Sequence, residues 1–513
     1  MWGGQGRSKK LYRHHQCVFG KLSVNTRSTV SPTTGYMCFV GRDTGFERKA
    51  FVMSEHRKSQ LWVAVIVLSF GTIAEAQNPP PAQFRIATFS ADVTVPIGHR
   101  CMGVLPTKVT RIKDPLEAFG FVLLGPDQPI VVVAVDWCEI RNGAYDQWRE
   151  SLAKAAGTKR ERVLVTSLHQ HDAPVTDAGA AALLNKVGLQ GELYDEEFHA
   201  LCIKRTAAAL KKSLESSQRL THLGTGQAVV ENIASNRRVQ REGRPASFDR
   251  GSRSGGDEFH RNAPVGLIDR NLKTVSFWSS DRPVVALSVY ATHPMSYYGR
   301  GEVSADFVGL ARRQRQLDLP DVMQIYASGC SGDVTAGKYN DGSEKSRQQL
   351  VARLHAAMLA AWENTRKVPL TEISLRDTEL FLEYYDHKDL KPKNLQAVLD
   401  NESARTEDRI LAAMSLSSHQ RNTAKQAIDF PCVDFGSAQL LLFPGEAFVG
   451  YQLMAQQMKP NSFVVSMGYG ECWPGYIPTK AAFVDGFHDK WLWVAPGSEA
   501  RIRKALTTVL NVD

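Results

Sequence analysis

The chain is predicted to be an α/β protein with a mixed β-sheet core, flanking helices and a single large catalytic domain. Its 513 residues are 43% hydrophobic and 22% charged, which is typical of a globular protein with a large core. Short apolar runs alternate along the chain with helical patterns. The run 130–137, IVVVAVDW, is of the kind that forms a strand buried on both faces.

Short apolar runs predict the strands, because a strand buried on both faces loses its polar alternation. These runs cover residues 130–137, 163–166, 284–293, 322–326, 439–443 and 463–467. Helical periodicity is clearest where Leu350, Leu354, Met358 and Trp362 recur every four residues. Further helices are predicted at 194–214, 394–428 and 498–510. The segment 251–256, GSRSGG, predicts a flexible loop within the domain.

The net charge of +9 is concentrated at the beginning of the chain. Residues 1–76 hold 11 Lys and Arg against four Asp and Glu, so they carry +7 and the remainder carries +2. Such a nearly neutral body predicts no nucleic-acid partner.

Residues 53–76 are predicted to be a cleaved signal peptide. Arg57 and Lys58 precede a short apolar run, 61–70, and AEA at 74–76 is a small-x-small cleavage site. The alternative is an uncleaved anchor. We expect a mature start near Gln77, a linker over 77–85, and a secreted or periplasmic catalytic domain over 86–513. Residues 1–52 are predicted to be a non-native or disordered extension, with Met53 the true start.

Six cysteines follow residue 76, and their wide spacing names no pairing. Export to an oxidising compartment permits disulfides. We expect between zero and two bridges, with scattered core thiols as the alternative.

His169 and His171 are the most informative residues of the chain. The apolar run 163–166 leads directly into them, and residues i and i+2 of an extended backbone share a face. Imidazole is the commonest metal ligand and the usual acid or base near neutral pH. The alternative is a pair of surface histidines in a loop.

Other predicted strand ends also deliver side chains that can bind a metal: His293, Glu446 and Tyr476. A catalytic zinc site needs about three N or O ligands from different elements and one open position. Each residue also has an ordinary structural alternative. His293 could be a core histidine, Glu446 could cap a helix, and Tyr476 could simply pack.

Five segments, in order, resemble those of the neutral (non-lysosomal) ceramidases, over roughly residues 86–513. LHQHDAP is similar to the family's THTHSGP, and THPMS is similar to HPTS. NRR, residues 236–238, resembles the family's arginine segment, and SGDVTAG, residues 331–337, resembles GDVSPN. LFPGE and GYIPT resemble its closing glutamate and tyrosine segments. The ordered set is far more specific than any one segment.

The resemblance implies a Zn²⁺ cofactor held by His169, His293, Glu446 and Tyr476. It also implies catalytic and substrate-binding residues outside the ligand set. By position, the catalytic residues are His171, Arg237, Thr335 and His488, and the substrate-binding turn contains Gly332, Asp333 and Thr335.

The chain departs from the family's pattern around the substrate rather than at the metal. Thr335 stands where the family has a serine, so its methyl is expected to crowd ceramide. His488 stands where a second tyrosine is common, and Ala336-Gly337 replaces Pro-Asn. The chain ends at Asp513, so we expect no C-terminal immunoglobulin-like domain.

The sequence therefore predicts a zinc-dependent hydrolase that cleaves an N-acyl amide bond in a ceramide-like lipid or a related amide. Its partners would be that substrate and, transiently, a membrane surface. Two alternatives remain open. One is a metal-independent Ser/Thr hydrolase using Thr335 or Ser331, and the other is a non-catalytic lipid- or glycan-binding protein on a ceramidase-like fold. The sequence leaves the oligomeric state undetermined.

Overall fold

The computed structural model describes residues 83–512. The predicted extension 1–52, the signal peptide 53–76 and most of the linker lie outside the described residues. Strand β1 begins at Phe84, so the first strand starts two residues before the predicted domain boundary at 86. Among the described helices, none is both long enough and apolar enough to cross a membrane.

Three sheets form the core, and each contains one parallel pair of strands. The first has the order β6-β4-β3-β1-β8: Val163–Ser167, Ile130–Val135, Glu117–Leu124, Phe84–Asp92 and Gln218–Leu220. The second has the order β14-β12-β11-β9-β16: Met323–Ser328, Arg282–Tyr290, Asn271–Ser279, His222–Val229 and Arg366–Pro369. The third has the order β17-β18-β19-β21: Ser374–Leu380, Ile428–Asp434, Ala438–Leu442 and Phe463–Met467. The parallel pairs are β4 with β6, β12 with β14, and β19 with β21, and all other pairs in these sheets are antiparallel.

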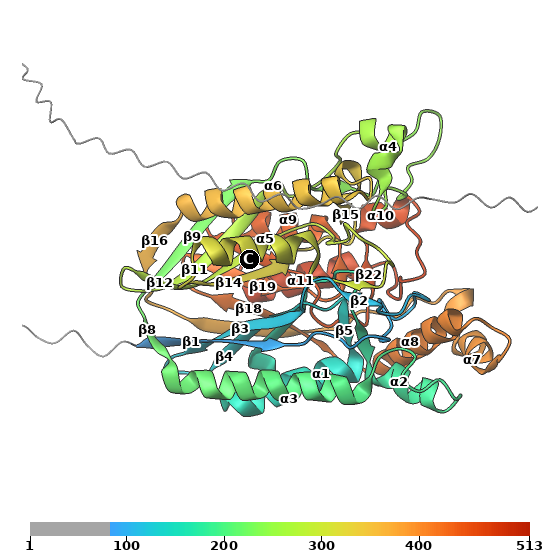
Figure 1. The fold of residues 1–513 in the computed structure, drawn as a ribbon, viewed down its shortest axis with the longest axis horizontal. Helices are drawn as coiled ribbons and strands as arrows, with labels where there is room; N and C mark the ends of the chain where they lie inside the picture. Colours follow the sequence, from blue (N-terminus) through green and yellow to red (C-terminus); the bar gives the residue numbers. More distant parts are fainter. Residues whose placement is uncertain (1–82, 513) are drawn as a thin grey trace, which may run out of the picture. The chain divides into compact units, whose positions relative to one another are not determined.

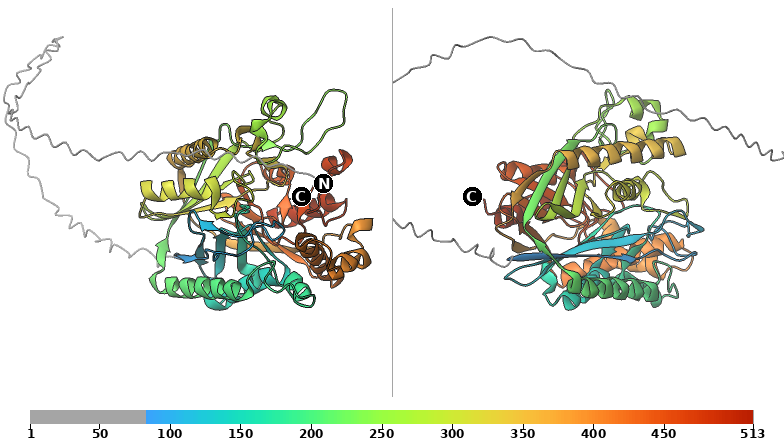
Figure 2. Two further views of the ribbon diagram at one scale, coloured as in Figure 1. Left: turned by 45° about the vertical axis from the view of Figure 1, so that its right-hand side comes forward. Right: turned by 60° about the vertical axis from the view of Figure 1, so that its left-hand side comes forward.

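The first two sheets pack face to face between two layers of helices (Figure 1). Phe121 of β3 and Phe277 of β11 meet between the sheets, with ring centroids 5.1 Å apart. Helices α1 (Asn142–Ala156) and α3 (Glu196–Ser213) cover the outside of the first sheet. Helices α5 (Asp306–Asp318) and α6 (Glu344–Glu363) cover the outside of the second, and Figure 2 shows the same layers from two further directions. This arrangement confirms the predicted α/β class with a mixed sheet core.

Shorter elements complete the fold. The remaining helices are α2 (Ala178–Asn185), α4 (Glu258–Asn262), α7 (Pro392–Asp400), α8 (Thr406–Thr423), α9 (Val449–Met458), α10 (Lys480–Val484) and α11 (Ser498–Leu510). The short strands are β2 (Arg111–Ile112), β5 (Glu139–Arg141), β7 (Val175–Asp177), β10 (Ser235–Asn236), β13 (Glu302–Val303), β15 (Val334–Thr335), β20 (Glu446–Ala447) and β22 (Tyr476–Ile477).

Most predicted elements are present, with two differences that matter for the site. Strand β12 ends at Tyr290, before His293, and the N–H of His293 instead donates to the carbonyl of Val334 at 3.0 Å. The polar stretch 394–428 is two helices, α7 and α8, and its last residue already belongs to β18. All six cysteines of the described residues are buried and free, so this part of the chain has no disulfide.

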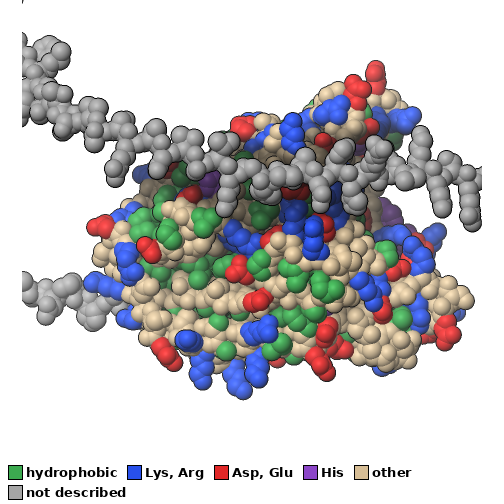
Figure 3. Space-filling view, in the orientation of Figure 1, with side chains coloured by type: hydrophobic (Ala, Val, Ile, Leu, Met, Phe, Trp, Pro, Cys, Tyr) green, Lys and Arg blue, Asp and Glu red, His purple; other side chains and the backbone are tan. Residues whose placement is uncertain are grey.

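Acidic and basic side chains are interspersed on the molecular face drawn in Figure 3. This mixed surface agrees with the nearly neutral charge of the chain after residue 76.

Candidate metal centre

The carboxyl ends of the three parallel strand pairs meet at one place. The N–H of Ser167, at the end of β6, donates to the carbonyl of Tyr469 at 3.0 Å. The N–H of Gly468, after β21, donates to the carbonyl of Ser328 at the end of β14 at 2.8 Å. These bonds tie the three sheets together, so segments far apart in sequence leave their strands side by side.

His169, His293 and Glu446 bring three ligand atoms together at this junction. The two Nε2 atoms lie 3.2 Å apart. Glu446 Oε2 lies 2.9 Å from Nε2 of His293 and 3.3 Å from Nε2 of His169. Ligands about 2.0–2.1 Å from a tetrahedral zinc are separated by about 3.3 Å, so this triangle has the size that a zinc ion requires.

The other ring nitrogen of each histidine fixes the position of its proton. Nδ1 of His169 lies 3.0 Å from the carbonyl of Cys138, and Nδ1 of His293 lies 2.6 Å from that of Ser331. A carbonyl only accepts, so each Nδ1 carries the proton and donates it. With the proton on Nδ1, Nε2 of each ring is the nitrogen available to bind a metal, which is the usual arrangement of metal-binding histidines.

Burial and charge favour the ligand forms of these groups. His293 has no exposed surface, and burial lowers the pKa of its imidazole, which keeps the ring neutral. Glu446 is 2% exposed, so its carboxyl belongs to the same buried group as the two rings. A neutral imidazole pair with a carboxylate is a donor set that zinc prefers.

The backbone at His169 corrects the strand argument from the sequence. Strand β6 ends at Ser167, and His169 has a positive φ of 68°, so the histidine pair does not lie on an extended strand. His171 still lies nearby, with its ring centroid 5.2 Å from that of His169 and nearly perpendicular to it. Its buried ring nitrogens have no partner among the described residues, and burial lowers the pKa of His171 well below its usual value.

Tyr476 and Arg237 lie beside the ligand triangle. Tyr476 is the register partner of Glu446 in the parallel pair β20–β22. Nη1 of Arg237 donates to the Tyr476 hydroxyl at 2.6 Å, and its backbone N–H donates to the carbonyl of Asp333 at 2.7 Å. Burial raises the pKa of Tyr476 well above its usual value, so the phenol keeps its proton.

A cavity of about 300 Å³ connects these side chains. Five of the predicted metal ligands or catalytic residues line it: His169, His171, Arg237, Glu446 and Tyr476. The remaining lining residues are Met102, Cys138, Gly251, Ser252, Met295, Tyr298, Asp489 and Trp491. Sequence reasoning missed this second set. Two of its members carried a signal, since Cys138 directly follows the apolar run 130–137 and Met295 lies within the THPMS segment.

Gly332 and Asp333, predicted to bind substrate, do not line this cavity. They instead form hydrogen bonds to the segment that carries Glu446. The Gly332 N–H donates to the carbonyl of Ala447 at 3.0 Å, and a Cβ at position 332 would lie 2.1 Å from the Glu446 carbonyl oxygen. Asp333 accepts from the Val449 N–H at 2.8 Å. These bonds position Glu446 and helix α9.

Thr335, predicted to contact substrate, is fully buried and does not line the cavity. It forms a parallel bridge with His293, and its hydroxyl oxygen accepts the N–H of Gly337 at 3.2 Å. The hydroxyl of Ser331 is bonded to the Tyr469 hydroxyl at 2.7 Å. Neither hydroxyl faces the cavity with a histidine base beside it, which disfavours a Ser/Thr hydrolase.

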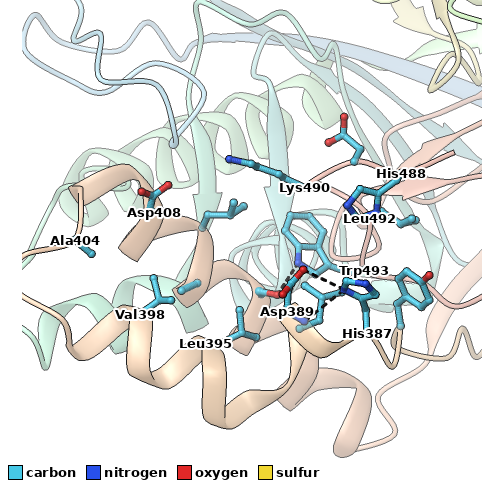
Figure 4. Close-up of a pocket in the computed structure, with 16 residues that line it drawn as sticks. His387, Asp389, Leu395, Val398, Ala404, Asp408, His488, Lys490, Leu492 and Trp493 are labelled. Atoms are coloured by element: carbon cyan, nitrogen blue, oxygen red, sulfur yellow. Dashed lines mark hydrogen bonds and ion pairs between the residues drawn. The ribbon is translucent and has the colours of Figure 1, made fainter. Parts of the chain in front are cut away.

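His488 lies in a different cavity, shown in Figure 4, rather than beside the ligand triangle. This second cavity has a volume of about 510 Å³ and is lined by both apolar and charged side chains, including some from α7 and α8. His387 lies near His488 in it, with ring centroids 5.8 Å apart. The sequence-based catalytic role of His488 is therefore not supported by its position. Its neighbour Asp489 lines both cavities.

The fold is that of solved neutral ceramidase structures. No protein-family model and no curated protein matches the sequence. The solved structures that match in three dimensions include a neutral ceramidase from Pseudomonas aeruginosa and a ceramidase complexed with C2. Each has a TM-score of 0.62 and 15% sequence identity, over 84% of this chain and 75% of the other. The ceramidase-like fold expected from the sequence segments is thereby confirmed.

Proposed function

We propose that this chain is a zinc-dependent amidohydrolase that cleaves the N-acyl bond of a ceramide-like lipid or a related amide. One observation carries the proposal. The unprotonated Nε2 atoms of His169 and His293 and the Oε2 atom of Glu446 face one another at 2.9–3.3 Å. Three acceptors converging without a proton repel one another, and a cation between them makes the arrangement stable.

Zinc, when bound, supplies Lewis acidity that activates water near neutral pH and polarises a substrate carbonyl. The neighbouring residues would stabilise the oxyanion and transfer the proton. The guanidinium of Arg237 and the hydroxyl of Tyr476, bonded to each other at the cavity wall, are placed to donate to the oxyanion of an attacked amide. His171, whose ring nitrogens have no hydrogen-bond partner among the described residues, would take a proton from the attacking water and pass it to the leaving amine.

The substrate class is inferred from the fold shared with the two ceramidase structures, together with the ordered segments of the sequence. Export is part of the same proposal, with a mature chain beginning near Gln77. Sequencing the N-terminus of the native secreted protein tests it, and residues upstream of Met53 would contradict the proposed start.

The function is tested by counting metal in the purified protein and assaying a panel of N-acyl amides that includes ceramide. We expect about one zinc per chain and hydrolysis that a chelator abolishes and zinc restores. Chelator-resistant hydrolysis would point to a metal-independent enzyme. Bound zinc without turnover of any amide would point to a binding protein.

A further inference from the structure

We propose that Cys138 and His171 form a second metal position beside the zinc ligands, one that takes a thiophilic divalent cation such as cadmium. Both residues line the 300 Å³ cavity. A ligand atom from each, together with one from His169, lies within 4.8 Å of the others. The cavity therefore offers two overlapping ligand groups, and His169 belongs to both.

The ring of His169 already belongs to the ligand group that it forms with His293 and Glu446. Its Nε2 faces His293 and Glu446, and its Nδ1 donates to the Cys138 carbonyl. The Cys138 thiol lies 4.0 Å from that same Nδ1 rather than beside Nε2 in the first ligand triangle. A second ion would therefore be held by the Cys138 sulfur and a His171 nitrogen, while His169 stays on zinc.

His171 supplies the observation that points to a ligand. It is 5% exposed, and neither of its ring nitrogens has a hydrogen-bond partner among the described residues. A buried imidazole without partners retains a free lone pair inside the cavity. A thiol beside such a nitrogen selects soft cations, because sulfur ligands prefer them to magnesium or calcium.

Binding is a simple exchange of a proton for a metal ion. The Cys138 S–H bond breaks, its proton passes to solvent, and a sulfur–metal bond forms while His171 donates its lone pair. No electron transfer is involved. Because the ion occupies the group proposed to serve the leaving amine, its binding would inhibit hydrolysis. This inhibition, and the zinc retained beside the second ion, rest on the proposed function.

The test is a cadmium titration of the zinc-loaded full-length protein. Thiolate–cadmium charge-transfer absorption is followed, and both metals are counted after gel filtration. We expect one cadmium per chain in addition to retained zinc. Cadmium that displaces zinc one for one, or no cadmium absorption band, would overturn the second position.

Two variants test whether Cys138 and His171 bind the cadmium. A third variant tests whether the loss of another buried cysteine has the same effect. Cys138→Ser should lose the absorption band and His171→Asn should weaken cadmium binding at least about tenfold, the lower limit for loss of a supporting group at a metal site. Both should keep their zinc. Cys101→Ser changes a buried cysteine outside the cavity lining and should retain the band. A band that persists in Cys138→Ser would refute the assignment.

Experiments can refute the second metal position and the proposed hydrolase activity independently of each other. A chain that binds cadmium as described but hydrolyses no amide would keep the second position and refute the proposed hydrolase. A chain that hydrolyses an amide, yet binds no cadmium beside its zinc, would refute only the second position. If Cys138→Ser does not fold, His171→Asn and the metal counts on the unmodified protein still decide the outcome.

Discussion

The Nε2 atoms of His169 and His293 lie 3.2 Å apart and face each other beside the carboxyl group of Glu446. Each ring donates its Nδ1 proton to a backbone carbonyl, at Cys138 for one and Ser331 for the other. Two facing lone pairs beside a carboxylate cannot form hydrogen bonds with one another. The backbone around the two rings thus prepares them for a cation.

Replacing any one of the three ligands should remove the zinc. His169→Ala, His293→Ala and Glu446→Ala each leave two ligands, fewer than a catalytic zinc site requires. We expect zinc affinity to fall by more than about 100-fold, since loss of a mere supporting group already costs 10- to 100-fold. Elemental analysis after dialysis measures it. His355→Ala, which changes a histidine paired with Asp318 at the surface, is the control and should keep its zinc.

His171→Ala should separate turnover from metal binding. His171 lines the cavity but lies outside the group formed by His169, His293 and Glu446. We therefore expect about one zinc per chain and a fall in kcat of about 10²- to 10⁴-fold, the range for loss of a proton-transfer group. Loss of zinc in this variant, with zinc retained in His169→Ala, would reverse the roles of the two histidines.

The bond between Arg237 and Tyr476 should matter more to kcat than to zinc content. Tyr476→Phe and Arg237→Met each remove one proposed oxyanion donor, and we expect kcat to fall about 10²- to 10³-fold in each. Because the two groups are bonded at 2.6 Å, the double variant should lose less than the two single losses combined. Loss of zinc from Tyr476→Phe would instead make the tyrosine an indispensable metal ligand.

The strand ends were predictable from the sequence, but the side chains that face the cavity were only partly so. Apolar runs end just before His169 and Glu446, and that pattern is readable because a buried strand must be followed by a polar turn. Asp489 and Trp491 lie on an irregular segment between α10 and α11, where no periodicity indicates direction. Only the tertiary contacts place them in the cavity.

A place in a motif does not by itself put a side chain in the metal cavity. His488 and Asp489 are neighbours, yet Asp489 lines the metal cavity and His488 does not. Similarly, Thr335 follows the expected motif, but its hydroxyl is bonded to the Gly337 N–H. A motif fixes the order of residues along the chain, whereas the local dihedral angles decide which of them face a substrate.

Thr335→Ser should therefore leave substrate preference unchanged, contrary to the expectation from the sequence. Serine keeps the hydroxyl that accepts from Gly337, and the lost methyl lies in the core. We expect the unfolding free energy to fall by about 1 kcal/mol. The ratio of activities on ceramide and on a short N-acyl amide should not move. A gain confined to ceramide would show that this methyl does crowd the substrate.

The burial of His199 in α3 predicts that the stability of the protein depends on pH, independently of the metal centre. The side chain is 2% exposed and lies among Trp137, Trp148 and Tyr194, with ring centroids 5.3–6.4 Å away. Burial lowers the pKa of His199 to about 4. The unfolded chain, with a pKa of about 6.5, binds the proton more readily. The unfolding free energy should therefore fall as the pH decreases from about 6.5 towards 4.

This contribution amounts to about 2 kcal/mol between pH 7 and pH 5. His199→Phe keeps a flat ring in the same aromatic surroundings but cannot bind a proton. Urea unfolding at both pH values, with a chelator present so that zinc binding does not contribute, should show a smaller loss of stability at pH 5 in the variant than in the unmodified protein. His355→Phe, at a residue 25% exposed in its side chain, serves as the matched control and should leave the pH dependence near that of the unmodified protein. An equal loss in His199→Phe and the unmodified protein would mean that His199 is already hydrated, or already protonated, in the folded state.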